Sequence, residues 1–418
     1  MQPIDPELLQ KLAAEHGTPC YVYFADVMRE RLRRLRAFDV VRYAQKACSN
    51  VHVLRLLRAE GARVDAVSLG EIERALKAGF QPGFLECGHD AEIVLTADVA
   101  DAATLARVVE LGIPMNAGSV DMLSALRERL PAGRRHPVWL RINPGFGHGH
   151  SRKTNTGGES SKHGVWHADL PAALAAIDRL GLDLVGLHMH IGSGADVEHL
   201  ARVADAMVEQ VFALGRPISA ISAGGGLSVP YRPGDREVDV QAYFRIWDDS
   251  RKRIEERLAR RVSLEIEPGR YLVAEAGVLV AEVLAVKREG GNRFALVDAG
   301  FNDLMRPAMY GSHHEITIVR RHGGVAGGVP VPLVVGGPLC ESGDVFTQGE
   351  GGVVVPRALP EPAVGDLVVF HDTGAYGASM ASNYNSRPYA PEVLVDGGAP
   401  RLIRRRQRLD DLLRLEEV

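Results

Sequence analysis

Eight short runs of apolar and β-branched residues recur along the first two thirds of the chain, and segments with helical periodicity lie between them. The runs are Val40–Ala44, Val64–Ser68, Ile93–Thr96, Ile113–Asn116, Val138–Ile142, Leu184–His190, Ala220–Ala223 and Ser263–Ile266. Leu69–Ala78 is one of the helical segments, with Ile72 and Ala75 on its apolar face, and Ser119 is placed to cap a second helix over Asp121–Arg129. Strands that alternate with helices form parallel βα units. Eight such units predict an α/β protein built on a (β/α)₈ barrel of about 250 residues.

Beyond Tyr271 the helical periodicity gives way to strand-like runs with Gly- and Pro-rich connections, and it returns only at Leu409–Leu415. The runs are Val278–Val286, Phe294–Val297, Pro332–Val335, Leu367–Phe370 and Glu392–Val395. The chain has 418 residues, more than one core usually supports, so we expect a separate C-terminal β-sandwich or barrel-like domain. The linker is placed near Ala274–Gly277. We therefore predict a barrel over residues 25–274 and a β domain over 275–418, joined by 1–24 because Tyr21–Phe24 also resembles a strand.

Charge and cysteine usage narrow the classes of partner. The net charge is −4, from 49 basic and 53 acidic residues, with no long basic run. This balance argues against nucleic acid or an anionic membrane and favours a small molecule as the partner. Four cysteines lie far apart without a CxxC pair, so neither a zinc ribbon nor a disulfide framework is indicated. No run of 18 apolar residues occurs, so a cytoplasmic protein with reduced thiols is expected.

Lys46 directly follows the first predicted strand, in the sequence Tyr43-Ala-Gln-Lys-Ala47. A lysine amine near other cations or apolar walls loses its proton easily and attacks carbonyls to form a Schiff base. Most lysines at strand ends are merely solvated, so Lys46 gains weight only from the motifs that accompany it.

Glycines and an arginine follow the seventh and eighth strands, at the barrel end where chemistry is usually found. Gly225 and Gly226 lie in a triple-glycine run, and Gly269 precedes Arg270. Consecutive glycines let the backbone approach an anion, and loops after these two strands commonly bind phosphate. Tight turns would explain either glycine group alone but not their coincidence.

Two histidines and a glutamate end the sixth and eighth strands. His188 and His190 share a strand face, yet no carboxylate or cysteine at ligand spacing accompanies them, so we expect no metal site. His190 is better suited to stacking on a planar cofactor. Glu267 is placed to hold a ring nitrogen protonated, and an ion pair with Arg141 is its alternative role.

A lysine imine, a phosphate cradle and a carboxylate for a ring nitrogen together describe a site for pyridoxal 5′-phosphate. The chain resembles the fold-type III enzymes that use this cofactor, the alanine racemase and group IV decarboxylase superfamily, and most closely the diaminopimelate decarboxylases. The resemblance covers nearly the whole chain. Its motifs are the lysine motif, His188–Ser193, Gly224–Gly226, Glu267–Arg270, Arg306–Tyr310, Cys340–Asp344 and Gly374–Gly377.

The resemblance implies a role for each matching residue. Lys46 is similar to the Schiff-base lysine, His190 to the residue stacked on the ring, and Glu267 to the partner of the ring nitrogen. Cofactor contacts are implied for Ser193, Gly225, Gly226, Gly269, Arg270 and Tyr376, and substrate contacts for Arg270, Arg306, Tyr310, Glu341 and Tyr376. The family is homodimeric with shared active sites, to which Cys340, the implied proton donor, and Glu341 come from the other subunit.

The implied reaction is decarboxylation of meso-2,6-diaminopimelate to L-lysine and CO₂, the last step of lysine biosynthesis. The distal carboxylate and ammonium of this substrate require cations and an acid, which Arg270, Arg306 and Glu341 provide. Decarboxylases of ornithine or arginine type read no distal carboxylate, and two arginines would repel a lone ammonium. The alternatives are such an enzyme, a carboxynorspermidine decarboxylase, or an inactive regulator; the last would be expected to have lost Lys46 or Cys340.

Overall fold

The computed structural model describes residues 4–83, 91–147, 155–192 and 197–417. The chain divides into two compact units, which we name the barrel unit and the β unit. The barrel unit comprises Arg29–Ser228 and Glu237–Tyr271, and the β unit comprises Met1–Met28, Val229–Arg236 and Leu272–Val418. The boundaries inferred from the sequence, 25–274 for the barrel, stay a prediction.

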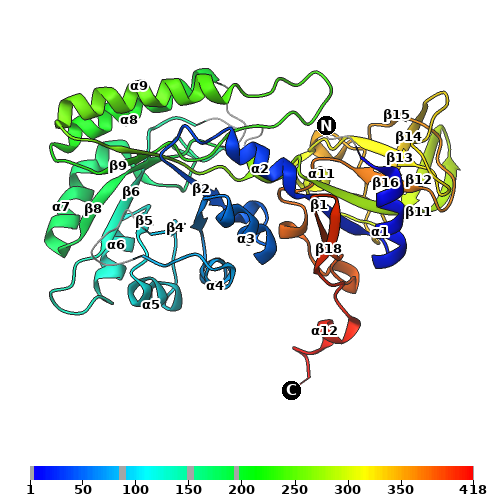
Figure 1. Ribbon diagram of the computed structural model, residues 1–418, viewed down its shortest axis with the longest axis horizontal. Coiled ribbons are helices and arrows are strands. Elements are labelled where there is room, and N and C mark those ends of the chain that lie inside the picture. The colour runs from blue at the N-terminus through cyan, green and yellow to red at the C-terminus, as the bar shows by residue number, and fades with distance from the viewer. Residues whose placement is uncertain (1–3, 84–90, 148–154, 193–196, 418) are drawn as a thin grey trace. The chain divides into compact units, whose positions relative to one another are not determined.

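Eight parallel strands close into a barrel, which confirms the predicted fold class (Figure 1). They are β2 (Val40–Ala44), β3 (Arg63–Ala66), β4 (Ile93–Ala97), β5 (Met115–Ala117), β6 (Pro137–Asn143), β8 (Asp183–Met189), β9 (Ala220–Ser222) and β10 (Ser263–Ile266). Pairing of Glu265 with Val40 and of Ile266 with Val41 closes the ring between β10 and β2. A two-residue strand, β7 (Val165–Trp166), adds to β6. Since all strands of the ring are parallel, their carboxyl ends share one mouth.

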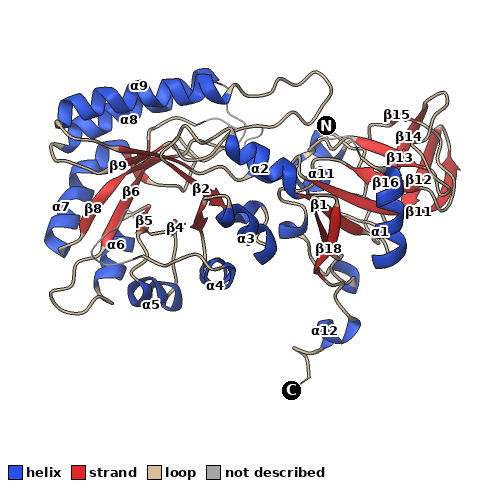
Figure 2. Cartoon of the chain, viewed as in Figure 1, coloured by secondary structure: helices blue, strands red, loops and turns tan. Residues whose placement is uncertain are grey.

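Helices follow the strands and lie on the outside of the barrel (Figure 2). They are α3 (Val51–Ala59), α4 (Leu69–Ala78), α5 (Ala102–Leu111), α6 (Val120–Arg127), α7 (Leu170–Leu180), α8 (Val197–Leu214) and α9 (Val240–Leu258). Capping residues decide where several of them begin: Ser68 accepts from the Glu71 amide at 3.3 Å, and Ser119 from the Met122 amide at 3.2 Å. Helix α2 (Ala25–Arg33) runs across the division between the units.

The β unit is organised around one mixed sheet, in the order β15-β14-β12-β11-β1-β17-β18; off this path β16 pairs with β11, and β13 pairs with β16. Its strands are β1 (Cys20–Phe24), β11 (Gly277–Glu289), β12 (Asn292–Val297), β13 (Ile316–Val319), β14 (Val331–Gly336), β15 (Arg357–Leu359), β16 (Leu367–Phe370), β17 (Glu392–Asp396) and β18 (Ala399–Arg404). Strand β1 lies between β11, antiparallel, and β17, parallel. The chain thus places its first strand inside a sheet built from its last third.

Helix α1 (Pro6–His16) supplies one side of the core of the β unit. Asp5 caps it, accepting from the Glu7 and Leu8 amides at 3.0 and 3.2 Å. Leu9 and Leu12, exposed by 0% and 1%, pack with apolar residues of the sheet such as Val22 and Val393. Burying side chains of this size stabilises the fold by about 1.5–3 kcal/mol each.

Short helical elements complete the chain. Helices α10 (Arg270–Val273), α11 (Arg306–Tyr310) and α12 (Leu409–Leu413) are short, as are the 3₁₀ turns η1 (Gln45–Ala47), η3 (His167–Asp169), η4 (Glu350–Gly352), η5 (Ala378–Met380) and η6 (Tyr384–Ser386). Among the residues that the structure describes, no helix has both the length and the apolar character needed to cross a membrane.

Candidate active site

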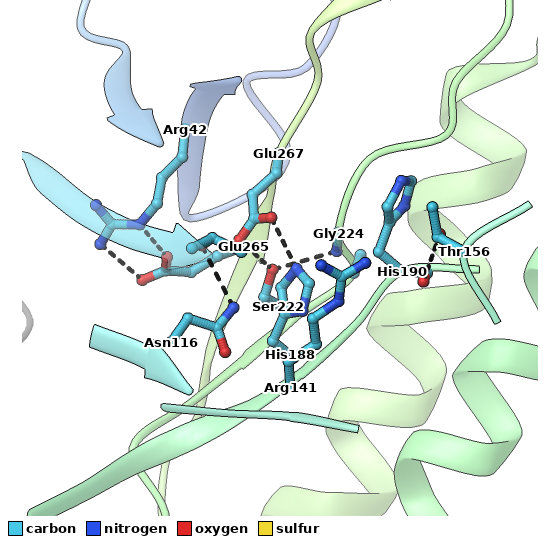
Figure 3. A network of polar contacts seen from close by, with 12 residues as sticks. Arg42, Asn116, Arg141, Thr156, His188, His190, Ser222, Gly224, Glu265 and Glu267 are labelled. Carbon is cyan, nitrogen blue, oxygen red and sulfur yellow. Dashed lines mark hydrogen bonds and ion pairs between the residues drawn. The ribbon is translucent and has the colours of Figure 1, made fainter. Parts of the chain in front are cut away.

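A buried carboxylate at the mouth of the barrel anchors the candidate site (Figure 3). Glu267 directly follows β10 and is 8% exposed. Its Oε2 accepts from His188 Nε2 at 2.7 Å, and its Oε1 accepts from the Ser222 hydroxyl at 3.0 Å. Three neighbouring strand ends, those of β8, β9 and β10, therefore meet at one carboxylate. Burial lowers the pKa of Arg141, the alternative predicted partner, and the charge of Glu267 opposes that fall, but the hydrogen bonds to Glu267 come from His188 and Ser222.

These two donors keep Glu267 ionised. Burial alone would raise the pKa of the carboxyl, but the charge and hydrogen bond of His188 and the hydroxyl of Ser222 outweigh it and lower the pKa. Each carboxylate oxygen has a second lone pair, so Glu267 retains acceptor capacity for a protonated ring nitrogen. This is the state that an electron-withdrawing pyridine ring requires of its partner.

His190 follows β8 and presents a neutral ring. Burial, Arg141 and Lys46 hold the pKa of its imidazole well below the ordinary value. The Thr156 hydroxyl donates to the His190 carbonyl at 3.0 Å, which ties the backbone of His190 to the loop after β6. A buried imidazole atom, Nδ1, has no hydrogen-bond partner among the described residues. A neutral, flat ring in this position fits against a planar cofactor.

Positions 225 and 226 lie next to the His190 ring. Both are glycine because a side chain would not fit there. A Cβ on Gly225 would lie 2.6 Å from the Glu267 carbonyl oxygen and 3.7 Å from His190 Cε1. Gly226 has a φ of +109°, and its Cβ would lie 2.8 Å from the Gly192 carbonyl oxygen. The close approach leaves backbone exposed to a ligand beside His190, which is the geometry of a phosphate cradle.

Lys46 lies in the 3₁₀ turn η1, immediately after β2, and its side chain is exposed. A Cβ on Gly269 would approach the Ala44 carbonyl oxygen to 3.1 Å, so glycine allows the loop after β10 to pack against the lysine turn. The charge of Lys46 lowers the pKa values of Asp65 and Glu267 and lowers that of His190. Lys46, His190 and Glu267 therefore share one electrostatic environment.

Asp65 is a member of this environment that the sequence analysis did not single out. It lies on β3, is 1% exposed, and its Oδ1 has no hydrogen-bond partner in the described part of the chain. Burial, together with the negative charge of Glu267, raises the pKa of Asp65 to about 8. The sequence could have indicated Asp65, because it is a charged residue within the mostly buried strand Arg63–Ala66. Such a side chain has to point into the barrel.

A second charged layer lies behind the site, and the sequence motifs did not predict it either. Arg42 Nε and Nη2 lie 2.5 and 3.4 Å from the Glu265 carboxylate, and Arg42 Nη1 donates to the Ala91 carbonyl at 3.0 Å (Figure 3). The pair is 1% and 2% exposed. It connects β2, which leads to Lys46, with β10, which leads to Glu267.

Other predicted site residues lie in the β unit. Arg306 is 5% exposed at the start of α11, and Tyr310 ends that helix half-buried. Cys340 and Glu341 are exposed, and the Cys340 amide donates to Asn385 Oδ1 at 2.9 Å. Tyr376 has a φ of +58°, an uncommon backbone conformation for a residue other than glycine. The cofactor contact implied for Tyr376 stays a prediction.

Arg270 and Ser193 are the remaining predicted cofactor residues. Arg270 is buried, with 8% exposure, at the start of α10 in the barrel unit. Ser193 lies outside the described residues. The barrel unit thus brings together Lys46, His190, Glu267 and the glycine loops.

The donor set of this site fits pyridoxal 5′-phosphate. Lys46 is placed to hold an aldehyde, ionised Glu267 a ring nitrogen, His190 a ring face, and the glycine backbone a phosphate. Clusters of three or more His, Cys, Asp or Glu side chains suitable for a metal ion are absent from the described ranges.

Comparisons with known proteins agree with this chemistry. Residues 25–274 match the family model for the pyridoxal-binding domain of pyridoxal-dependent decarboxylases. A diaminopimelate decarboxylase of Streptomyces coelicolor is 62% identical, covering 98% of this chain and 92% of the relative; one of Escherichia coli K12 is 60% identical, covering 98% and 96%.

Solved structures of diaminopimelate decarboxylases share the fold of this chain. A crystal structure of diaminopimelate decarboxylase superposes with a TM-score of 0.94 at 60% identity, covering 98% of this chain and 96% of the other. The Helicobacter pylori diaminopimelate decarboxylase, complexed with L-lysine, gives a TM-score of 0.85 at 32% identity, covering 98% and 99%.

Proposed function

The chain belongs to the pyridoxal-dependent decarboxylases and, within them, to the diaminopimelate decarboxylases, and we propose that the residues at the barrel mouth carry out its reaction. It is a pyridoxal 5′-phosphate-dependent carboxy-lyase that converts meso-2,6-diaminopimelate to L-lysine and CO₂ in lysine biosynthesis. The observation that carries the assignment of residues is Glu267, held ionised by His188 and Ser222 beside the turn that bears Lys46.

When bound, the cofactor supplies an electron sink for the pair left behind as CO₂ departs. Glu267 would keep the ring nitrogen protonated, because its lowered pKa leaves the carboxylate charged at neutral pH. Neutral His190 would pack against the ring face, and the backbone N–H groups of Gly225, Gly226 and Gly269 would donate to the phosphate, with Ser193 and Tyr376 as further contacts. Lys46 Nζ would hold the cofactor at its aldehyde carbon.

The lysine assignment has a direct test. Borohydride trapping of the holoenzyme followed by peptide mass spectrometry should place the cofactor on Lys46, and Lys46→Ala should abolish turnover. Label on Lys77, Lys153 or Lys162 instead would overturn the assignment.

Substrate choice rests on charge at the distal end of the substrate. Arg270 and Arg306 pair with the distal carboxylate, Glu341 with the distal ammonium, and Tyr310 and Tyr376 line the same end. Ornithine has no distal carboxylate, so it would not make the charge-assisted contacts with Arg270 and Arg306 that diaminopimelate makes. Comparable kcat/KM values for diaminopimelate and ornithine would contradict this reading, and carboxynorspermidine, assayed alongside, tests the remaining alternative.

Each active site is shared across a homodimer. Cys340 Sγ holds the proton delivered to the product carbon, and it enters with Glu341 from the other subunit. Residues 1–24 and 275–418 form a β domain that contributes to the dimer interface and to the active site, and residues 25–274 form the cofactor-binding barrel. The support is the family resemblance, together with the exposure of Cys340 and Glu341 on the β unit. An isologous contact would build two equivalent sites. The enzyme works in the cytoplasm.

A mixing experiment tests the shared site. Lys46→Ala and Cys340→Ala chains, each inactive, are refolded together, so that one site of a mixed dimer carries both defects and the other carries neither. Activity should return to the mixed dimers, isolated with two different affinity tags. Mixed dimers as inactive as their parents would show that Cys340 serves its own chain.

A further inference from the structure

Arg306 in the β unit is held between an aromatic face and a histidine. Its guanidinium carbon lies 4.7 Å from the centre of the Tyr231 ring, within the range of a cation–π interaction. Arg306 Nη1 lies 2.9 Å from His314 Nε2. The Tyr231 and His314 rings meet edge to face, with centroids 5.5 Å apart and planes at 78°. Two neighbours of Arg306 therefore brace each other as well as the guanidinium.

The hydrogen bonds determine the tautomer of His314. His314 Nδ1 lies 2.8 Å from the His371 carbonyl oxygen, which only accepts, so Nδ1 carries the proton. Arginine only donates, so Nε2 is the bare acceptor for Arg306. Burial, Arg306 and Arg357 hold the pKa of His314 well below the ordinary value, in agreement with a neutral ring. His314 is 2% exposed, and Arg357 Nη1 donates a hydrogen bond to its carbonyl oxygen.

Both of these partners are neutral, so they orient the guanidinium without cancelling its charge. Asp372 also lies within electrostatic reach: burial raises its pKa to about 7, with Glu275 adding to the rise and Arg306 opposing it. A purely structural Arg306–Asp372 interaction is therefore the competing role for Arg306. Two neutral braces suit an arginine that has to receive an anion in a defined direction.

Tyr231 reaches this position on a segment that leaves the barrel unit. Val229–Arg236 is part of the β unit, although the residues on both sides of it belong to the barrel unit. The segment begins three residues after Gly226, the last glycine of the triple-glycine run in the proposed phosphate cradle. A single loop after β9 thus carries both a candidate cofactor contact and the aromatic support of Arg306.

We propose that Tyr231 and His314 are positioning residues that hold the Arg306 guanidinium in the orientation that receives the distal carboxylate of the substrate. The inference rests on the proposed function, in which Arg306 binds that carboxylate. Neither residue is expected to touch the reacting atoms, so both act on affinity for the carboxylate and leave the pH profile of kcat unchanged.

The test compares two ligands that differ only by a carboxylate. L-lysine carries it and cadaverine lacks it, and each is titrated into the holoenzyme, with dissociation constants read from the cofactor absorbance. The paired variants are Tyr231→Leu with Tyr231→Phe, and His314→Leu with His314→Gln, which keeps an acceptor for Arg306. Thr317→Val is the matched control, because it removes a hydroxyl bonded to His371 Nε2 at 2.8 Å in the same unit.

We expect Tyr231→Leu and His314→Leu to weaken L-lysine binding by about 3- to 30-fold, the range of a desolvated cation–π or charged hydrogen-bond contact. Cadaverine binding should change by less than about twofold, and the Phe, Gln and Val variants should resemble the wild type. Tyr231 is only half-buried, so its variants should fold. If His314→Leu does not fold, the comparison of Tyr231→Leu with Tyr231→Phe tests the positioning role.

Arg306→Met distinguishes failure of the positioning role from failure of the proposed function. If Arg306→Met removes the preference for L-lysine while Tyr231→Leu retains it, the positioning role is wrong and the proposed function stands. If the wild type binds both ligands equally and does not decarboxylate diaminopimelate, both fail.

Discussion

Removal of one partner of the Arg42–Glu265 pair should destabilise the barrel unit far more than removal of both. Arg42 and Glu265 are 1% and 2% exposed, so solvent does not screen the charge that is left behind. Arg42→Met strands a buried carboxylate and takes the donor from the Ala91 carbonyl. Breaking a buried pair costs about 3–5 kcal/mol, whereas an apolar replacement of both residues is often neutral or stabilising. Arg42→Met with Glu265→Leu should therefore recover most of the loss.

The chain contains its own probe for this experiment. Its three tryptophans, Trp139, Trp166 and Trp247, all belong to the barrel unit, so tryptophan fluorescence during urea unfolding reports on that unit alone. Trp139 and Trp247 are buried, with 3% and 0% exposure, and their emission should shift to the red on unfolding.

A matched pair in the same unit supplies the control. Arg58 and Glu92 form the same two-contact arrangement, at 2.9 and 3.4 Å, with side chains 35% and 27% exposed. Because solvent screens this pair, Arg58→Met should cost less than about 1 kcal/mol. Equal costs for Arg42→Met and Arg58→Met, or a double variant as unstable as the sum of its parts, would refute the reasoning.

Three further predictions concern single residues of the barrel unit. His136 is fully buried, and burial lowers its pKa to about 4, so the unfolded chain binds more protons between pH 6.5 and 4 and stability is lost as the pH falls through that window. This amounts to up to about 3 kcal/mol, and His136→Gln should flatten the dependence seen by tryptophan fluorescence; an unchanged slope would contradict it. Gly225→Ala should weaken binding of pyridoxal 5′-phosphate, measured by absorbance titration, by about 5- to 150-fold, since its Cβ would lie 2.6 Å from the Glu267 carbonyl oxygen. Gly70→Ala, within α4 and with the Ser68 hydroxyl no nearer than 3.9 Å, should instead raise the free energy of unfolding by about 0.5–1 kcal/mol and leave cofactor affinity unchanged; a loss of stability there would count against the helix geometry.

The barrel was predictable from sequence because its strands are buried and its helices amphipathic. The first and last predicted strands, Val40–Ala44 and Ser263–Ile266, match β2 and β10 residue for residue. In the β unit, three strands went unpredicted: β13, β15 and β18. Strand β18 is mostly exposed, and β15 has three residues, so neither carries the apolar alternation that marks a strand. Pairing with distant neighbours, which no local pattern reveals, makes them strands.

The candidate site divides in the same way. Residues that end strands in unusual motifs, such as Lys46, His190 and Glu267, were recognisable because the barrel topology collects strand ends at one mouth. The partners of those residues were not, since strand register decides which side chains meet. Sequence offered Arg141 as the partner of Glu267, whereas the register of β8 and β9 brings His188 and Ser222 to it. Roles assigned to individual residues stay predictions until the experiments above are done.

The position of β1 has a consequence for synthesis of the chain on the ribosome. Cys20–Phe24 emerges early, but its neighbours β11 and β17 follow only after the whole barrel has been translated. At about 5–20 residues per second, roughly 250 intervening residues take on the order of ten to fifty seconds. During that time an apolar, aromatic segment has neither of its hydrogen-bonding edges covered. Nascent chains that stall within the barrel are therefore prone to aggregate through this strand. Chaperones that bind apolar segments of nascent chains should raise the yield of folded protein.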